Sequence, residues 1–435
     1  MSNSVAVQEK RFIRLIPSNN STTGFSPSGS QPIMRFSVAD TQALAMMKDA
    51  RLNFKIKCTK TGGADIAFAD DINIDPTLGF CSVLDQVIVS SRRHGTQLEQ
   101  VLNMGRLESS YYRSKYSPKM MASCQYHGGR AVGMGRMNRW DGSFTGGSTT
   151  TDLKSLAMRK SITGTKEVSI PFHIGMFLTD ESLDLSAIGG LEIAVYLQKS
   201  EAMFFGGFAQ MSDVSYTLTD VSLTIPLLYK SMQMIQSTPP ESVVEFLNWT
   251  SLYSVLDSSV SSIAHRLSLS GLVSAIHNTL PTAQINNTAY NQFALKSVAP
   301  ERLTFQRDGL RSPLEKTMIV EDKRSSKSED KSTTYPEILT EYLSAWGATK
   351  DLKYSQVIPE LVKGVANRSG VVGMGCNYSP DSAGINVSGV LSMDLQSKLE
   401  NETGGDPLTI EPYALYSFYL SRQAFATSPQ GIKSL

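Results

Sequence analysis

Histidines are the residues of this chain best suited to proton transfer or metal binding, and their spacing argues against both roles. The five are His94, His127, His173, His265 and His277. No two lie at H-x-H or i, i+4 spacing and none has a neighbouring cysteine, so the patterns typical of zinc sites are missing. His265 shares the apolar parity of Ile263 and Leu267. We therefore predict a hydrogen-bonded core histidine there, and the same interpretation applies to His173 beside a strand end.

Acidic pairs are the next candidates for chemistry. They occur at Asp70–Asp71, Asp180–Glu181 and Glu321–Asp322. A glycosidase needs two carboxylates that converge across a cleft, whereas adjacent acids in a strand or loop usually point apart. A hard-cation site built from Asp70, Asp71 and Asp75 is an alternative, but a hydrated loop explains this cluster better.

Glycine-rich motifs complete the search for catalytic or cofactor-binding signatures. GVVGMG (370–375) and GMG (133–135) match neither the dinucleotide-binding nor the P-loop spacing, and no G-x-S-x-G elbow occurs. We therefore expect no catalytic residues, no cofactor and no bound metal, and predict that the protein is not an enzyme.

One stretch of the chain departs strongly from the overall net charge of +1. Residues 91–160 contain 12 Lys or Arg against four Asp or Glu, a net charge of +8, with Tyr111, Tyr112, Tyr126 and Trp140 among them. Such a stretch could contact packaged DNA or an inner membrane through phosphates, or acidic residues of a neighbouring copy. The candidate inner-surface basic contacts are Arg92, Arg93, Arg113, Lys115, Lys119, Arg130, Arg136 and Arg139.

The dominant pattern in the chain is one-for-one alternation of apolar and polar residues. It is clearest in RLNFKIK (51–57), EVSIPF (167–172), LEIAVYLQ (191–198) and INVSGVLSMDL (385–395). A period of two places alternate side chains on one face of a strand, so these segments predict sheets with one buried face. YALYSFYLS (413–421) is apolar at both parities, which predicts a strand buried on both faces.

Departures from simple alternation predict a bulge and several helices. In 214–228 the apolar parity changes near Thr219–Asp220, as a β-bulge would cause. Helical spacing suggests helices around 98–104, over 271–281 and over 335–347. Residues 243–256 also show helical spacing, with a strand as the alternative.

The predicted elements fall into two halves of similar rhythm. Residues 1–30, rich in Ser, Asn, Gly and Pro, predict an extended N-terminal arm. The Pro-Pro pair in 236–242 predicts a linker. The halves on either side, 31–235 and 243–435, each contain strands, a helix-bearing insertion and further strands, which suggests two β-domains in tandem.

Bulk composition narrows the class further. A net charge of +1 argues against a general nucleic-acid binder. Four widely spaced cysteines indicate free thiols rather than a disulfide framework. The N-terminal residues contain no apolar run typical of a secretory signal, and no stretch approaches the length of a membrane span. We expect synthesis in the cytoplasm or nucleus of a host cell, without secretion.

The order of these segments resembles the major capsid proteins of double jelly-roll DNA viruses, above all polinton-like viruses and virophage-like relatives. The segments that carry the resemblance are FSPSGSQPIMRFSV (25–38), RLNFKIK (51–57), EVSIPFHIGMF (167–177), GGLEIAVYLQKSEAMF (189–204), YTLTDVSLTIPLLY (216–229) and, more loosely, 375–395 with 412–423. The resemblance implies a mainly β fold with two tandem eight-stranded antiparallel jelly-roll sandwiches and short helices in the loops.

Further expectations follow from this resemblance. Three chains would form a pseudo-hexameric capsomer that tiles an icosahedral virion shell, with penton and minor capsid proteins as further partners and no small-molecule substrate. The arm 1–30 would become ordered only on assembly. Two alternatives remain: a single jelly-roll capsid or penton protein with a projecting domain, and a β-sandwich carbohydrate-binding or hydrolytic protein.

Overall fold

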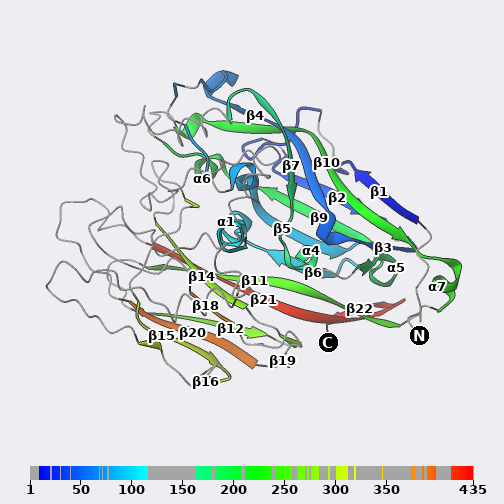
Figure 1. The fold of residues 1–435 in the computed structure, drawn as a ribbon. Helices are drawn as coiled ribbons and strands as arrows, with labels where there is room; N and C mark the ends of the chain where they lie inside the picture. Colours follow the sequence, from blue (N-terminus) through cyan, green and yellow to red (C-terminus); the bar gives the residue numbers. More distant parts are fainter. Residues whose placement is uncertain are drawn as a thin grey trace.

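The fold was analysed in a computed structural model. It describes most of residues 9–115 and 162–256 and, beyond them and with short gaps, 262–283, 292–293, 300–311, 318–319, 374–377, 385–397 and 413–434, together with Ala345. The described residues form two β-sandwiches, which lie one above the other in Figure 1.

Two antiparallel sheets make up the first sandwich. One sheet has the order β7 (Thr165–Pro171), β4 (Arg51–Thr59), β10 (Ser215–Tyr229), β3 (Ala43–Ala45) and β8 (Leu183–Asp184), with β1 (Glu9–Leu15) on the other side of β10. The second has the order β2 (Ile33–Val38), β9 (Leu191–Leu197), β5 (Leu84–Ser91) and β6 (Gln97–Val101). The predicted alternation is confirmed, because Leu52, Phe54 and Ile56 of β4 are all buried in the core.

The second sandwich is also antiparallel. Its first sheet has the order β11 (Ser242–Leu256), β21 (Tyr413–Ser428), β14 (Ile276–Ala283) and β18 (Met374–Asn377), with β22 (Gly431–Ser434) beside β21. Its second has the order β12 (Ser262–Leu269), β20 (Gly389–Ser397), β15 (Pro300–Arg307) and β16 (Leu310–Arg311), with β17 (Met318–Ile319) beside β15; β13 (Leu272–Val273) pairs with β19 (Ile385–Asn386). The prediction of a mainly β double sandwich is confirmed.

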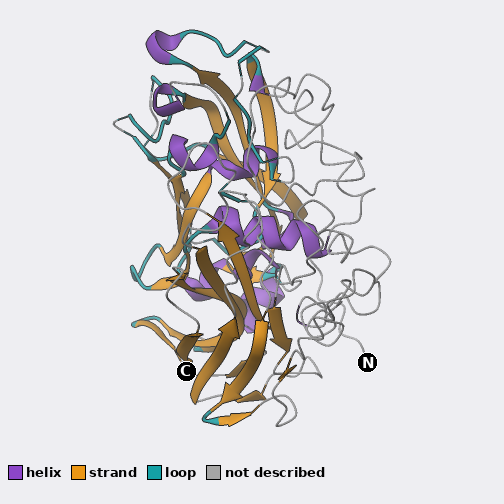
Figure 2. Ribbon diagram, turned by 90° about the vertical axis from the view of Figure 1, so that its left-hand side faces the viewer, coloured by secondary structure: helices purple, strands orange, loops and turns teal. Residues whose placement is uncertain are grey.

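Helices are short and gather between the sandwiches and at the loop ends (Figure 2). They are α1 (Met104–Lys115), α4 (Gly175–Leu178), α5 (Leu185–Ile188), α6 (Ser200–Met203) and α7 (Met232–Ser237), with 3-10 turns η1 (Met47–Asp49), η2 (Thr61–Gly63), η3 (Gly79–Val83) and η5 (Met211–Asp213). The predicted linker 236–242 overlaps the end of α7 and the start of β11.

Three helix predictions were wrong or displaced. Residues 97–101 form β6, and α1 begins only at Met104, because Asn103 has a positive φ of 55° that separates the two elements. Residues 243–256 are strand β11, the alternative interpretation. Residues 276–283 are strand β14, where Pro281 lies beyond the four residues that pair with β18. The helix expected over 335–347 lies outside the described residues except for Ala345.

The predicted bulge in β10 is confirmed. Its register with β4 shifts between Thr219 and Ser222, and Asp220 has a positive φ of 51°. The extra residue allows Leu218 and Leu223 both to face the core.

Part of the predicted N-terminal arm pairs with the first sandwich in the lone chain, whereas we expected order only on assembly; residues 1–8 lie outside the described residues. Strand β1 pairs with β10 from Glu9↔Tyr229 to Leu15↔Leu223. Phe25 is buried, and its N–H and C=O both bond to Leu218 at 2.8 Å. Composition did not reveal this because the contact is made largely by backbone groups, which every residue carries.

His265 connects the two sheets of the second sandwich, as a core histidine should. From β12, its Nδ1 lies 2.5 Å from Ser417 Oγ on β21 and its Nε2 lies 2.7 Å from Ser254 Oγ on β11. The ring is buried, and burial lowers its pKa from 6.5 to about 4. It is therefore neutral at physiological pH, donating one hydrogen bond and accepting the other.

We predict that His265 makes the fold acid-sensitive. Because its folded-state pKa is depressed, the stabilisation is present above pH 6.5 and is lost as the pH falls towards about 4. The loss amounts to roughly 3 kcal/mol. The free energy of unfolding, measured with urea between pH 7 and 4, should show this loss for the wild-type chain. In H265Q, the free energy should fall less steeply with decreasing pH, because this contribution is absent. H94Q, a change in the half-buried β5–β6 turn, should keep the wild-type slope; an unchanged slope in H265Q would refute the assignment.

Candidate functional site: the joint between the two sandwiches

The distinctive feature of this chain is the joint between its sandwiches. It consists of β6, α1 and α4 from the first sandwich and β11, β21 and residues 292–293 from the second (Figures 1 and 2). One continuous buried cluster crosses it, and includes Phe246, Trp249, Tyr416 and Phe418 of the second sandwich. The two halves are therefore fused through a shared core rather than tethered by a linker.

A single buried carboxylate lies at the centre of the joint. Glu99 of β6 is 1% exposed. Its Oε1 accepts the N–H of Gly175 at 2.8 Å and the N–H of Trp249 at 2.9 Å, and its Oε2 accepts the N–H of Met176 at 2.9 Å. Gly175 and Met176 begin α4 in the first sandwich, whereas Trp249 lies on β11. The carboxylate thus satisfies backbone donors from both halves, including one on the open edge of β11.

Burial and hydrogen bonding act on Glu99 in opposite directions. Removal from water raises its pKa from the ordinary 4.5, and the three N–H donors lower it; burial is the larger effect, and the pKa is raised to about 7.

A second polar contact crosses the joint beside Glu99. Asn248 Nδ2 donates to the Leu98 carbonyl of β6 at 2.9 Å and to Gln423 Oε1 of β21 at 3.1 Å. With the neighbouring bond from Trp249 to Glu99, this contact fixes the register of β11 against β6.

Two glycines allow the halves to approach closely. A Cβ at Gly175 would lie 2.7 Å from backbone atoms of Leu247 and Asn248. A Cβ at Gly105 in α1 would lie 2.5 Å from Phe293 Cε1. Phe293 is 1% exposed, and its carbonyl accepts the Ser109 hydroxyl at 3.1 Å. A segment of the second half is thereby inserted against α1 of the first.

Arg106 lies in the same joint, although it belongs to the basic stretch of the sequence. Its guanidinium lies 4.4 Å from the centre of the Tyr416 ring and 5.7 Å from that of Phe293. It is 6% exposed, and desolvation lowers its pKa. This arginine therefore contributes to packing across the joint and not to surface charge.

His173 and Glu108 form a buried pair behind α4. His173 Nδ1 lies 2.5 Å from Glu108 Oε2, and the His173 N–H donates to Glu108 Oε1 at 3.1 Å. The ring stacks on Tyr111 with centroids 4.3 Å apart. The prediction of a satisfied, buried histidine is confirmed here as well.

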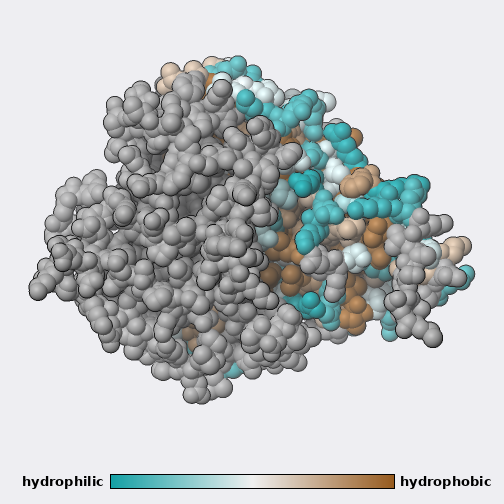
Figure 3. All heavy atoms as spheres, viewed as in Figure 1, coloured by the Kyte–Doolittle hydropathy of each residue, from teal (hydrophilic) through white to brown (hydrophobic). Residues whose placement is uncertain are grey.

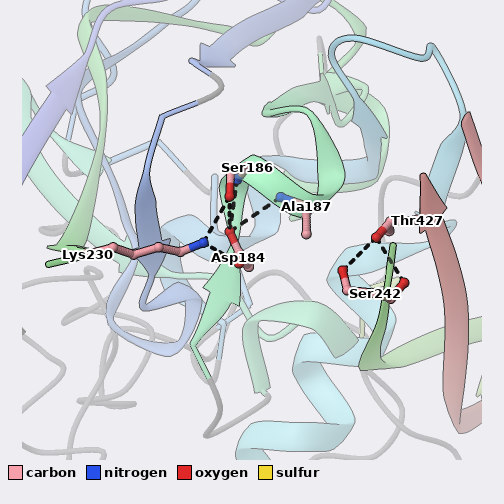
Figure 4. Close-up of polar contacts among 6 residues, drawn as sticks. All are labelled: Asp184, Ser186, Ala187, Lys230, Ser242 and Thr427. Carbon is pink, nitrogen blue, oxygen red and sulfur yellow. Dashed lines mark hydrogen bonds and ion pairs between the residues drawn. The ribbon is translucent and has the colours of Figure 1, made fainter. Parts of the chain in front are cut away.

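A buried ion pair anchors the chain where it leaves the first sandwich (Figure 4). Lys230 Nζ lies 2.5 Å from Asp184 Oδ2 and 2.9 Å from Ser186 Oγ, and the lysine side chain is 1% exposed. Asp184 also caps α5 by accepting the N–H groups of Ser186 and Ala187. In the same view, Ser242 and Thr427 bond side chain to side chain at 2.8 Å, where β11 begins beside β21.

The predicted basic contacts do not form one described cluster. Arg92 and Arg93 are exposed in the turn between β5 and β6, where their N–H groups donate to Gly190 and Gly189. Arg113 and Lys115 lie in the last turn of α1. Lys119, Arg130, Arg136 and Arg139 lie outside the described residues.

Two of the acidic candidates, Asp70 and Asp75, are described and have structural partners, whereas Asp71, Asp180–Glu181 and Glu321–Asp322 lie outside the described residues. Asp70 pairs with Lys60 at 2.6 Å and accepts the Ala67 N–H at 2.7 Å, while Asp75 accepts the Leu78 N–H at 2.8 Å. The described residues contain no group of three His, Cys, Asp or Glu side chains placed to bind a metal. No described helix is long and apolar enough to cross a membrane.

We predict that Gly175 cannot tolerate a side chain. G175A should destabilise the chain by roughly 1–3 kcal/mol, because its methyl group would meet the backbone of β11. Thermal unfolding measures the change. G431A is the matched control, since nothing lies within 4 Å of a Cβ at Gly431; it should shift stability by less than about 0.5 kcal/mol. Equal stability of the two variants would contradict the close approach.

The similarity of this chain to known proteins lies in its structure and not in its sequence. No protein family model matches the sequence, and no curated protein matches it. Among solved structures, the chain is similar to the PBCV-1 virus capsid, with a TM-score of 0.54, 8% identity and coverage of 98% of this chain and 96% of that one.

Two further structures agree. The Sputnik virophage structure matches with a TM-score of 0.55 and 10% identity over 98% of this chain and 88% of that one. The Faustovirus major capsid protein matches with a TM-score of 0.54 and 9% identity over 97% and 90%. Identities this low show a shared fold. The chain therefore has the double jelly-roll fold of viral major capsid proteins, as the sequence resemblance implied.

Proposed function

We propose that this chain is the major capsid protein of a double jelly-roll DNA virus and has no enzymatic activity. Three copies form a pseudo-hexameric capsomer, and capsomers tile an icosahedral shell. The observation that carries the proposal is the fold shared with viral capsid structures over nearly the whole chain. The fused joint supports it, because a shell subunit must hold its two sandwiches in one fixed relation.

The described surface supports a role in self-association. Figure 3 shows apolar side chains among polar ones on the face it draws. Several large apolar residues are exposed across both sandwiches, which is a cost in a lone chain but typical of contact surfaces. They are Phe12, Ile16, Leu102, Met232, Val243, Tyr253, Val255 and Val390.

Further partners follow from this role. Penton and minor capsid proteins would contact the capsomers, and the protein would be a virion component made in the host cytoplasm or nucleus. No cofactor or small-molecule substrate enters the proposal.

The two alternatives fare differently. A lone sandwich with a projecting domain predicts a different fold for 243–435, and the second sandwich contradicts it.

The second alternative, a hydrolytic protein, predicts two converging acids in a groove. A groove of about 1030 Å³ does contain Glu167 and Asp220. Both carboxylates form ion pairs with Lys55 Nζ, at 3.6 Å for Glu167 and 2.7 Å for Asp220. Lys55 lowers the pKa of Asp220, which is opposite to the change a general acid needs.

The size of the purified protein tests the assembly proposal. Light scattering should give a particle of three times the 47.5 kDa chain, and electron microscopy should show a hexagonal outline. A monomer at micromolar concentration that cleaves or binds sugars would contradict the proposal.

A charge reversal tests the basic contacts. If the β5–β6 turn faces packaged DNA or an inner membrane, R92E should weaken binding to duplex DNA or to anionic vesicles several-fold and should flatten the salt dependence. K433E reverses another exposed charge, on β22, and should leave binding unchanged. Loss of assembly in R92E with unchanged DNA and vesicle binding would instead assign the turn to a contact between copies.

A further inference from the structure

Glu99 is a titratable group with an unusual position, because one carboxylate bridges both sandwiches. Its three donors are all backbone N–H groups, two on α4 and one on β11, so they keep their charge state at every pH. The only chemical change available at this point of the joint is the gain or loss of a proton on Glu99 itself.

We propose that Glu99 is a protonation-dependent latch between the two jelly rolls, which holds the second sandwich most firmly when its carboxyl group is neutral. The ionised form keeps all three hydrogen bonds but leaves a full charge in a site shielded from water. The neutral form removes that charge. The inference concerns a property of the chain itself and goes beyond the shell-forming role proposed above.

Space beside the latch allows the joint to loosen. A cavity of about 160 Å³, partly open to solvent beside the exposed Val243, lies between the sandwiches; Ser182, Leu183 and Asp184 line one side and Val243 to Phe246 the other. Met176, which donates to Glu99, also lines it. A small shift of β11 away from α4 would open this cavity towards Glu99 and let water reach the ionised carboxylate.

Other charged groups near the joint are already paired or packed. No second titratable side chain occurs on β6 or α4. On β11, Glu245 pairs with Arg422 of β21 at 3.5 Å. Glu108 of α1 pairs with His173, and Arg106 lies on Tyr416. The described neighbours therefore provide no cation against Glu99 that would hold it ionised.

The direction of the pH effect follows from linkage. The folded chain binds the Glu99 proton more tightly than the unfolded chain, since the pKa is raised from 4.5 to about 7. The stabilisation from Glu99 is therefore complete below pH 4.5 and is lost progressively as the pH rises through about 7. His265 acts in the opposite direction, so the effect of Glu99 must be isolated by a variant.

The experiment compares melting temperatures of the unassembled wild-type chain and E99Q from pH 5 to pH 8. E99Q cannot titrate, so the melting-temperature difference between wild type and E99Q should shrink by about 3 °C across this range. E192Q is the matched control: it removes an acid of β9 that is half exposed and paired with Arg35, and its melting curve should run parallel to wild type. Parallel curves for E99Q and wild type would overturn the proposal.

A second measurement needs no variant and serves if E99Q does not fold. Hydrogen exchange of wild-type chain is followed by mass spectrometry in peptides from α4 and β11. After correction for intrinsic exchange rates, exchange there should rise about 10-fold from pH 5 to pH 8, while β4 and β9 stay constant. Equal change in all four segments would refute the latch. Neither measurement depends on shell formation, so failure here leaves the capsid proposal standing.

Discussion

The architecture depends on one buried carboxylate that satisfies backbone donors from two sandwiches. Glu99 accepts hydrogen bonds from the backbone N–H groups of Gly175, Met176 and Trp249, in a place that water does not reach. Strand β11 has an open edge towards the first sandwich, and an open edge is normally a site of uncontrolled pairing. Covering it with a side-chain acceptor joins the halves without extending either sheet, so the two sandwiches remain separate jelly rolls.

Close packing around that carboxylate makes the joint specific. Gly175 brings α4 against β11, and Gly105 makes room for Phe293. Hydrogen bonds to Glu99 need donor–acceptor distances near 2.9 Å, and these are reached only because no side chain separates the backbones at Gly175. Lys230 and Asp184 provide a second anchor where the chain passes from one half to the other. A joint held at several points would suit the proposed role as a repeated shell subunit.

Much of the fold was predictable from local pattern. Alternation in 51–57 and 191–198 placed strands with the correct buried parity, and the phase change at Thr219–Asp220 located the bulge. The prediction of a strand buried on both faces at 413–421 is confirmed for its described side chains, from Leu415 to Ser421. The helix predictions around 98–104 and over 271–281 were wrong for the residues that form β6 and β14. Short apolar runs fit both the helical period of 3.6 and the strand period of two, and only pairing with other strands decides between them.

The joint was not predictable in this way. Glu99 was only one of the four acids, and Arg106 only one of the 12 basic residues, counted in 91–160. The sequence does not show which charged residue will be buried by a segment some 150 positions away. The amino-acid sequence by itself determined the clearly alternating strands, their buried faces and the mainly β class, since these depend on periodicity within a few residues. Only the tertiary structure decided which groups meet across the domains, because those contacts arise from long-range packing that leaves no local pattern in the chain.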